Sequence, residues 1–189
     1  MKICVFCSSS DAVDGIYLAA AADMGALIGK AGHTLVFGGG RVGLMGAAAR
    51  AVHENGGRVI GIIPTFMNRP GVPYLACDEI SYTNGMRERK ALMMETSDAF
   101  VALPGGFGTL EEIAEVITQK QFDFVKGPLV AVNTEGFFDP LAAFFEKLYE
   151  MKFAKPGFRA TCPFVPTPSA AMDYIRGYTP PAAISKWFM

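Results

Sequence analysis

The stretch LPGGFGTLEE, residues 103–112, joins an apolar run that begins at Ala99 to a helical pattern that continues beyond Thr109. A short apolar run, then a glycine-rich turn and a helical pattern, is typical of a strand that leads into a crossover helix. Units of this kind build parallel sheets. The stretch therefore predicts a parallel α/β fold in which it forms the turn at the carboxyl end of one strand.

Apolar runs and helical patterns alternate in the same way along the rest of the chain. The expected strands cover residues 2–7, 34–37, 58–63, 99–103, 129–132 and 163–165. The expected helices cover residues 12–30, 43–55, 84–97, 109–124, 138–150 and 168–176. This order predicts a doubly wound, Rossmann-like α/β fold, with a mostly parallel sheet and helices on both faces. We expect a single domain over residues 1–189, with an extended C-terminal tail at 178–189.

Composition restricts the class of partner. Seventeen Lys and Arg against eighteen Asp and Glu give a formal net charge of −1, which provides no electrostatic footprint for a nucleic-acid polymer. No apolar run is long enough to span a bilayer, and the amino-terminal segment lacks a signal pattern, so we expect no membrane partner and a cytoplasmic location. Cys4 and Cys7 stand three apart in an expected strand and point to opposite faces. The other cysteines and both histidines lack ligand spacing, so no metal site is expected.

A first glycine loop, Gly38 to Gly43, fits G-x-G-x-x-G between an expected strand and an expected helix. The acid that binds the ribose of a dinucleotide is missing, because the next strand runs directly into Pro64. A nicotinamide or flavin dinucleotide is therefore disfavoured. The glycines either allow close strand-to-helix packing or form a second ligand loop through Gly39 and Gly40.

The second glycine loop, Pro104 to Thr109, indicates a phosphate site. Ligands of open parallel sheets bind beyond the carboxyl ends of the strands, where such a loop exposes backbone N–H groups at the positive end of a helix dipole. The lysine of a P-loop is absent, which favours a single phosphate over a triphosphate. Thr109 and Glu112 also fit a T-x-x-E capping box, so the residues alone favour a helix-capping role for Glu112.

Two cations, Arg89 and Lys90, flank an apolar stripe on the expected helix 84–97. They fit either a solvated face with long basic side chains or a site, since this helix leads into the strand before the second glycine loop. The segment 64–73 has three prolines and no periodicity, which predicts a surface loop beside the site.

These residues resemble the LONELY GUY family of cytokinin riboside 5′-monophosphate phosphoribohydrolases. The likeness rests on PGGFGTLEE at 104–112 and MRERK at 86–90, with supporting segments such as VFGGGRVGLMG and VIGIIP. It covers about residues 1–155. Two positions depart from the family: Arg87 stands where histidine is common, and the 64–73 loop lacks an acidic residue that relatives often keep.

The resemblance implies hydrolysis of the N-glycosidic bond of a nucleoside 5′-monophosphate, without a cofactor or metal, by a homodimer. It makes Arg89 and Glu112 the catalytic pair; Glu112 would stabilise the cationic sugar and orient water, and Arg89 would pair with Glu112, hold the phosphate, or both. It places at the substrate Lys90, Gly105, Gly106, Phe107, Gly108, Thr109, Leu110, Glu111 and Thr118. The alternative function is a non-catalytic carrier of a nucleotide or molybdopterin cofactor. A pyridoxal-dependent lysine decarboxylase is disfavoured, because no lysine lies in a recognisable cofactor motif.

Overall fold

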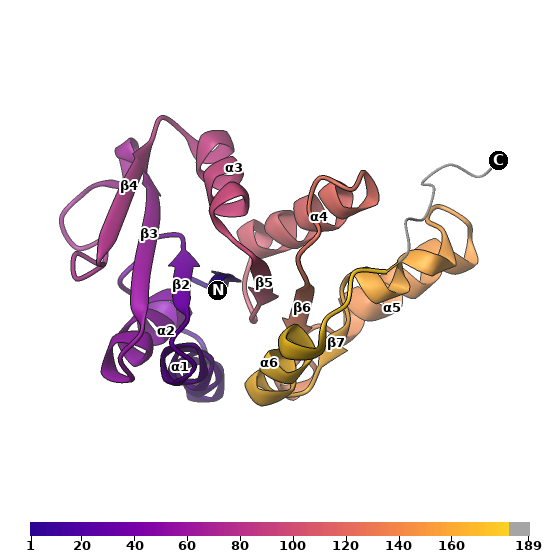
Figure 1. Ribbon diagram of the computed structural model, residues 1–189, viewed down its shortest axis with the longest axis horizontal. Helices are drawn as coiled ribbons and strands as arrows, with labels where there is room; N and C mark the ends of the chain where they lie inside the picture. Colours follow the sequence, from indigo (N-terminus) through magenta and orange to yellow (C-terminus); the bar gives the residue numbers. More distant parts are fainter. Residues whose placement is uncertain (182–189) are drawn as a thin grey trace.

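The computed structural model describes residues 1–181 and contains one seven-stranded, all-parallel sheet within them (Figure 1). The strand order is β4-β3-β2-β1-β5-β6-β7. The strands are β1 (Lys2–Phe6), β2 (Thr34–Phe37), β3 (Arg58–Pro64), β4 (Glu79–Thr83), β5 (Ala99–Ala102), β6 (Leu129–Val132) and β7 (Phe164–Val165). The predicted α/β class and parallel sheet are confirmed. Trp187 and Phe188, in the expected tail, lie outside the described residues.

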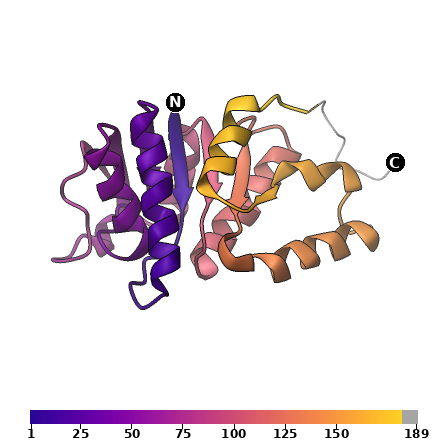
Figure 2. The same ribbon diagram turned by 90° about the horizontal axis from the view of Figure 1, so that it is seen from below.

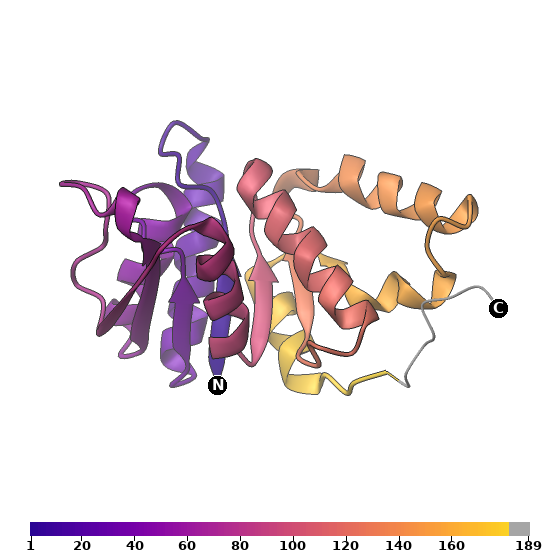
Figure 3. The ribbon, with the colours of Figure 1, turned by 90° about the horizontal axis from the view of Figure 1, so that it is seen from above.

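Helices cover both faces of the sheet, as predicted. One face carries α1 (Gly15–Lys30), α2 (Gly43–Glu54) and α6 (Pro168–Gly177), seen in Figure 2. The other carries α3 (Met86–Thr96), α4 (Phe107–Gln121) and α5 (Asp139–Glu150), seen in Figure 3. Three short 3-10 turns, η1 (Thr65–Met67), η2 (Thr134–Gly136) and η3 (Pro156–Thr161), complete the described elements.

The core follows from the period of two along each strand. On β1, Ile3 and Val5 pack into the layer beneath α1, α2 and α6, whereas Cys4 and Phe6 pack into the layer beneath α3, α4 and α5. Cys7 falls in the first layer and Cys4 in the second, which confirms that the two thiols face opposite ways. Strands buried on both faces need continuous apolar sequence, and this is why they could be located in advance.

One strand was missed. β4 (Glu79–Thr83) pairs with β3 in parallel at the edge of the sheet. Of its five residues only Thr83 is buried, so the apolar run that marks the other strands is absent. An edge strand is held by backbone pairing on one side and needs little apolar sequence, which is the physical reason that its pattern was too weak to detect.

The alanine-rich segment AAAADMGALIG, residues 19–29, packs against a neighbouring helix of its own chain. It lies in α1, in which Gly25 and Gly29 bring the helix against α2. A Cβ at Gly29 would lie 2.7 Å from the carbonyl oxygen of Val52, so only glycine permits this approach. These small residues thus account for the close packing of α1 against α2.

The chain reverses its direction of travel across the sheet between β1 and β5. After β1 it moves outward through β2, β3 and β4, and then α3 returns it to β5 on the other side of β1. The carboxyl ends of β1 and β5 are adjacent, with the Leu103 N–H donating to Phe6 O at 2.9 Å and the Ser8 N–H to Pro104 O at 3.2 Å. Such a switch point is where open α/β sheets bind ligands.

Candidate active site

A cavity of about 410 Å³ opens at this switch point. Its walls come from the end of β3, from the loops after β1, β2, β3 and β5, and from the helices α2, α3 and α4. The side chains and backbone that line it are those of Cys7, Ser8, Ser9, Ser10, Gly38, Gly40, Val42, Met45, Ile63, Met67, Gly71, Val72, Met86, Arg89, Gly106, Gly108, Thr109, Glu111 and Glu112. The volume lies in the range of small-molecule sites.

The second glycine loop presents the open end of a helix to this cavity. α4 begins at Phe107, two residues earlier than predicted, with Gly106 as its N-cap. The first intrahelical bond runs from Leu110 N–H to Gly106 O at 3.1 Å, so the amides of residues 107–109 precede it. Those amides lie at the positive end of the helix dipole and are suited to an anion.

The predicted capping box is wrong. Because α4 starts at Phe107, Thr109 is its third residue and Glu112 lies in its second turn, and no side chain caps the Gly106 end. The Thr109 side chain is buried against Gly105, where a Cβ would overlap its hydroxyl. Glu112 therefore does not cap the start of α4, although the T-x-x-E spacing predicted that it would.

Glu112 is an acid with a shifted pKa. Only 7% of the residue is exposed, and within residues 1–181 its carboxylate accepts no hydrogen bond and forms no ion pair. Burial raises its pKa from the ordinary 4.5 to about 7; Arg89 and Lys90 oppose this shift, and Glu111 and Glu115 add to it. A carboxyl with a pKa near 7 exchanges protons readily at neutral pH, as a general base must.

Arg89 is buried and fixed in place. Its Nε donates to Ile62 O at 3.2 Å, and its Nη1 lies 3.7 Å from Met86 Sδ. Its guanidinium lies against Gly38, at which any Cβ would overlap Nη2. Arg89 and Glu112 share the cavity but form no direct ion pair, which leaves space between a cation and an acid for a bound molecule.

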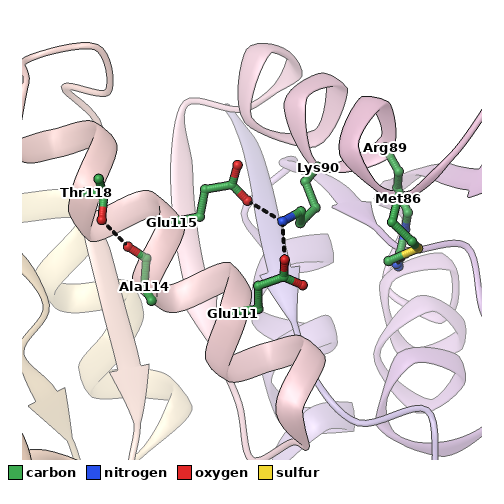
Figure 4. Close-up of polar contacts among 7 residues, drawn as sticks. All are labelled: Met86, Arg89, Lys90, Glu111, Ala114, Glu115 and Thr118. Carbon is green, nitrogen blue, oxygen red and sulfur yellow. Dashed lines mark hydrogen bonds and ion pairs between the residues drawn. The ribbon is translucent and has the colours of Figure 1, made fainter.

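Lys90 lies elsewhere, although it adjoins Arg89 in sequence. Its Nζ lies 2.5 Å from Glu111 Oε1 and 2.9 Å from Glu115 Oε2, as Figure 4 shows. It does not line the cavity, whereas Glu111 does. Thr118 is exposed and donates to Ala114 O at 2.8 Å, further along α4 (Figure 4). It does not line the cavity.

The remaining predicted contacts divide between two hollows. Gly106, Gly108 and Thr109 line the switch-point cavity, whereas Gly105, Phe107 and Leu110, again with Gly106, line a neighbouring apolar hollow of about 310 Å³. That second hollow is completed by Phe137, Phe138, Pro140 and Leu141. The second glycine loop thus has one side facing the cavity that contains Glu112 and the other side facing the hollow lined by Phe137 and Phe138.

In the first glycine loop, Gly40 lines the cavity and Gly39 does not. Gly39 has a left-handed backbone, with φ of 75°, and packs on Ile63. Gly43 has φ of 61°, and a Cβ there would come within 2.6 Å of Ser10 O. Gly39 and Gly43 therefore serve close packing, and Gly38 and Gly40 also border the cavity. A second ligand loop through Gly39 and Gly40 stays a prediction.

The 64–73 loop lies beside the cavity, as predicted, and is tied to the first glycine loop. The backbone N–H of Arg41 donates to Val72 O at 3.0 Å, and its Nε donates to Gly71 O at 2.7 Å. Met67, Gly71 and Val72 contribute to the wall. Arg87, one of the two departures from the family pattern, is exposed and does not line the cavity.

The serines after β1 were missed. Ser8, Ser9 and Ser10 follow the first strand directly and line the cavity. Three hydroxyls at the carboxyl end of a central strand were a usable signal, because that edge of the sheet carries the ligand site.

Two further properties concern the described residues. In residues 1–181, no group of three or more His, Cys, Asp or Glu side chains is placed to hold a metal ion. None of the helices in that range is both long and apolar enough to cross a membrane.

Comparison with known proteins identifies the family. A family model described as "Possible lysine decarboxylase" matches residues 45–175. The chain is 40% identical over 180 residues to the probable cytokinin riboside 5′-monophosphate phosphoribohydrolase LOGL5 of Oryza sativa subsp. japonica, covering 95% of this chain and 73% of the relative. It is 39% identical to the cytokinin riboside 5′-monophosphate phosphoribohydrolase LOG3 of Arabidopsis thaliana, covering 95% and 83%.

The chain belongs to the LONELY GUY (LOG) family. This LOG-family chain shares its fold with more distant proteins. The molybdenum cofactor binding protein from Rippkaea orientalis matches with a TM-score of 0.72 at 23% identity, over 93% of this chain and 94% of that one. The molybdenum cofactor carrier protein from Chlamydomonas reinhardtii matches with a TM-score of 0.72 at 23% identity, over 93% and 95%. At this identity the likeness shows the fold alone.

Proposed function

We propose that this protein is a phosphoribohydrolase that cleaves the N-glycosidic bond of N6-substituted adenosine 5′-monophosphates. The products are the free base and ribose 5-phosphate. The names of its relatives support the reaction class. The structural observation that carries the proposal is a buried carboxyl, Glu112, in a cavity that also holds Arg89 and the open end of α4.

The phosphate would bind at the first amides of α4, beside Gly106 and Gly108. Glu112 lies five residues after the start of the helix, which is about 7.5 Å along the helix axis. This is on the scale of a ribose 5-phosphate, so a phosphate held by the amides would bring the sugar to the carboxyl. Remote binding of this kind positions the reacting carbon and favours a nucleotide over a nucleoside.

Breaking the bond between C1′ and the base nitrogen leaves its electron pair on the base and positive charge on the sugar. The Glu112 carboxylate would stabilise that charge and take a proton from the water whose oxygen bonds to C1′, while the departing base takes up one proton. Because the Glu112 pKa is about 7, the carboxylate fraction increases as pH rises through that value. Turnover limited by this base should increase over the same range.

Arg89 would supply a fixed positive charge within the cavity. Its contacts with Ile62 O and Met86 Sδ use Nε and Nη1, and its Nη2 lies over Gly38, where there is no side chain. Since it forms no ion pair with Glu112 in the described residues, it is free to bind an anionic or hydroxyl group of the substrate. Arg89 and Glu112 would thus act on one bound nucleotide from different walls.

We also propose a homodimer of a single-domain chain, with the cytoplasmic location expected from the sequence. The dimer is supported by apolar side chains that remain exposed over α5 and the start of α4. No residue of α5 is buried, Phe144 is 54% exposed and Phe107 is 92% exposed. Light scattering of the purified protein should give twice the 20.3 kDa chain mass.

The assay that tests the activity compares three compounds. Isopentenyladenosine 5′-monophosphate, AMP and unphosphorylated isopentenyladenosine are each incubated with the pure protein, and free base is followed by chromatography. We expect release from the monophosphates and little from the nucleoside, and the ratio of the two monophosphate rates reports the preference for prenylated or plain adenine. Saturable binding of the monophosphates without release would instead support the carrier hypothesis.

A further inference from the structure

Lys90 connects two helices at the level of the active site. It extends from α3 to α4, where it contacts Glu111 at 2.5 Å and Glu115 at 2.9 Å (Figure 4). Glu111 and Glu115 are four residues apart and so lie on one face of α4. Only 12% of the Lys90 side chain is exposed, against 60% for Glu111 and 30% for Glu115. In residues 1–181 no other hydrogen bond or ion pair joins α3 to α4.

The residues of this contact are neighbours of the proposed catalytic pair. Lys90 follows Arg89 on α3, and Glu111 precedes Glu112 on α4. Arg89 is additionally held by the carbonyl oxygen of Ile62 on β3. A contact between Lys90 and Glu111 therefore fixes the separation of the two helices at the turns that carry the cation and the acid.

The same three charges surround Glu112. Partial burial opposes the charged form of Lys90, but the hydrogen bonds and charges of Glu111 and Glu115 outweigh it and raise its pKa. The charged groups around Glu112 are Arg89 and Lys90 from α3 and Glu111 and Glu115 from α4. On the β1 side lie the thiols Cys4 and Cys7, whose pKa values are raised chiefly by burial, so that they are neutral.

We propose that Lys90, through Glu111 and Glu115, is a positioning residue that sets the spacing of α3 and α4 and balances the charge around Glu112, and that it does not bind the substrate. Its effect on turnover rests on the proposed function. Its effect on Glu112 does not, because the proton equilibrium of a carboxyl can be measured without any substrate.

The first experiment compares Lys90→Met, Lys90→Arg and the double variant Lys90→Met/Glu115→Gln with the wild-type protein. Lys90→Met removes the contact that sets the spacing of α3 and α4, and it leaves the Glu111 and Glu115 carboxylates unbalanced beside Glu112. We expect kcat to fall by about 10- to 100-fold, the scale of a small misplacement of catalytic groups. KM should stay within about threefold of wild type. The midpoint of the pH–rate profile should move upward, since Lys90 lowers the Glu112 pKa.

The double variant is the decisive comparison. Glu115 raises the Glu112 pKa, so removing its charge together with that of Lys90 should return the midpoint toward wild type and recover part of kcat. Lys90→Arg keeps the positive charge and a side chain long enough to contact Glu111 and Glu115, so it should retain most of the wild-type kcat. A lysine that bound the substrate phosphate would give another result: Lys90→Met would raise KM, and Glu115→Gln would restore nothing. Lys30→Met, an exposed lysine at the end of α1, serves as the matched control.

The second experiment needs no turnover. The Glu112 carboxyl carbon is assigned by ¹³C NMR from its loss in Glu112→Gln and is titrated in each Lys90 variant. AMP binding is measured by calorimetry with Glu112→Gln added to each Lys90 variant, so that AMP is not turned over. We expect the Glu112 pKa to rise in Lys90→Met, to fall back in the double variant, and AMP affinity to be kept. An unchanged Glu112 titration, or loss of AMP binding in Lys90→Met, would overturn the proposal. If the wild-type protein releases no base, the proposed function fails and this titration still decides the role of Lys90.

Discussion

The two glycine-rich turns of this protein resemble each other in sequence but use their glycines differently. In the turn after β2, the space of the missing side chains is filled by the protein itself: Gly38 lies against Arg89, and Gly43 against Ser10. In the turn after β5, a Cβ at Gly106 or Gly108 would meet nothing within 4 Å. Gly105 is the exception there, because it packs on Thr109.

The difference shows what glycine provides in each case. After β2, glycine permits close approach between parts of the protein, and one result is that Arg89 can lie in the cavity. After β5, glycine keeps space open beside the first amides of α4, where a ligand can approach. Two similar glycine-rich turns therefore have different roles: the turn after β2 allows parts of the protein to pack closely, and the turn after β5 leaves the first amides of α4 accessible to a ligand.

The largest expected effect comes from the acid on the helix that follows the second turn. Glu112→Gln removes the proposed base and keeps the shape of the side chain, so kcat should fall by roughly 10²- to 10⁴-fold, the range for a positioned acid or base. Steady-state assays at saturating monophosphate measure this loss, and circular dichroism checks that the fold is kept. An unchanged rate would mean that the second turn binds nucleotide without Glu112 taking part in chemistry.

The same variant should change the dependence of stability on pH. The Glu112 pKa is about 7 in the folded protein and near its ordinary 4.5 in the unfolded chain, so the folded state holds this proton more tightly. The free energy of unfolding should therefore fall as pH rises from about 4.5 to about 7, by about 3 kcal/mol from this one group. It should regain that amount as pH falls.

Urea denaturation at several pH values measures this effect. Glu112→Gln lacks the titration, so its stability relative to wild type should grow across the same range and level off above pH 7. A constant difference between the two proteins would contradict the raised pKa and the burial that causes it.

Gly38→Ala, in the turn after β2, is expected to lower both stability and turnover, by less than the Glu112 variant lowers turnover. The loss of stability would distinguish this turn from the turn after β5. The new Cβ would overlap the Arg89 guanidinium, so that side chain must move. We expect a loss of about 1–3 kcal/mol in stability and a fall of about 10- to 100-fold in kcat. Gly15→Ala, at a position with nothing within 4 Å, is the control and should change neither. Normal turnover in Gly38→Ala would show that the position of Arg89 does not matter.

The smallest effect is expected for Gly108→Ala, in the turn after β5. Its Cβ meets no protein atom, so stability should be unchanged or slightly higher, since alanine favours helix. The methyl group would instead occupy space beside the amides and weaken AMP binding by about 10-fold, measured by calorimetry in proteins that also carry Glu112→Gln and so do not turn AMP over. Gly177→Ala, at the end of α6, is the matched control. Destabilisation by Gly108→Ala without loss of affinity would reverse the distinction between the turns.

Where the hydrophobic pattern of the sequence was strong, it predicted the bounds of the strands accurately. β2 and β6 were predicted with their observed bounds, because strands buried on both faces must be continuously apolar. The start of α4 was placed two residues late, because Thr109 and Glu112 fit a capping box that the helix does not use. Backbone geometry at Gly106 decided this boundary, and a side-chain pattern does not carry that information.

The sequence by itself determined the parallel sheet, the two glycine turns and the presence of a cation and an acid near the second turn, because hydrophobic period and turn residues are local properties. The tertiary structure decided which of two adjacent cations enters the cavity. Successive residues on a helix point about 100° apart, so Arg89 is directed into the site and Lys90 toward Glu111 and Glu115. It also decided the pKa of Glu112, because burial depends on residues far apart in the chain that only folding brings around the carboxyl.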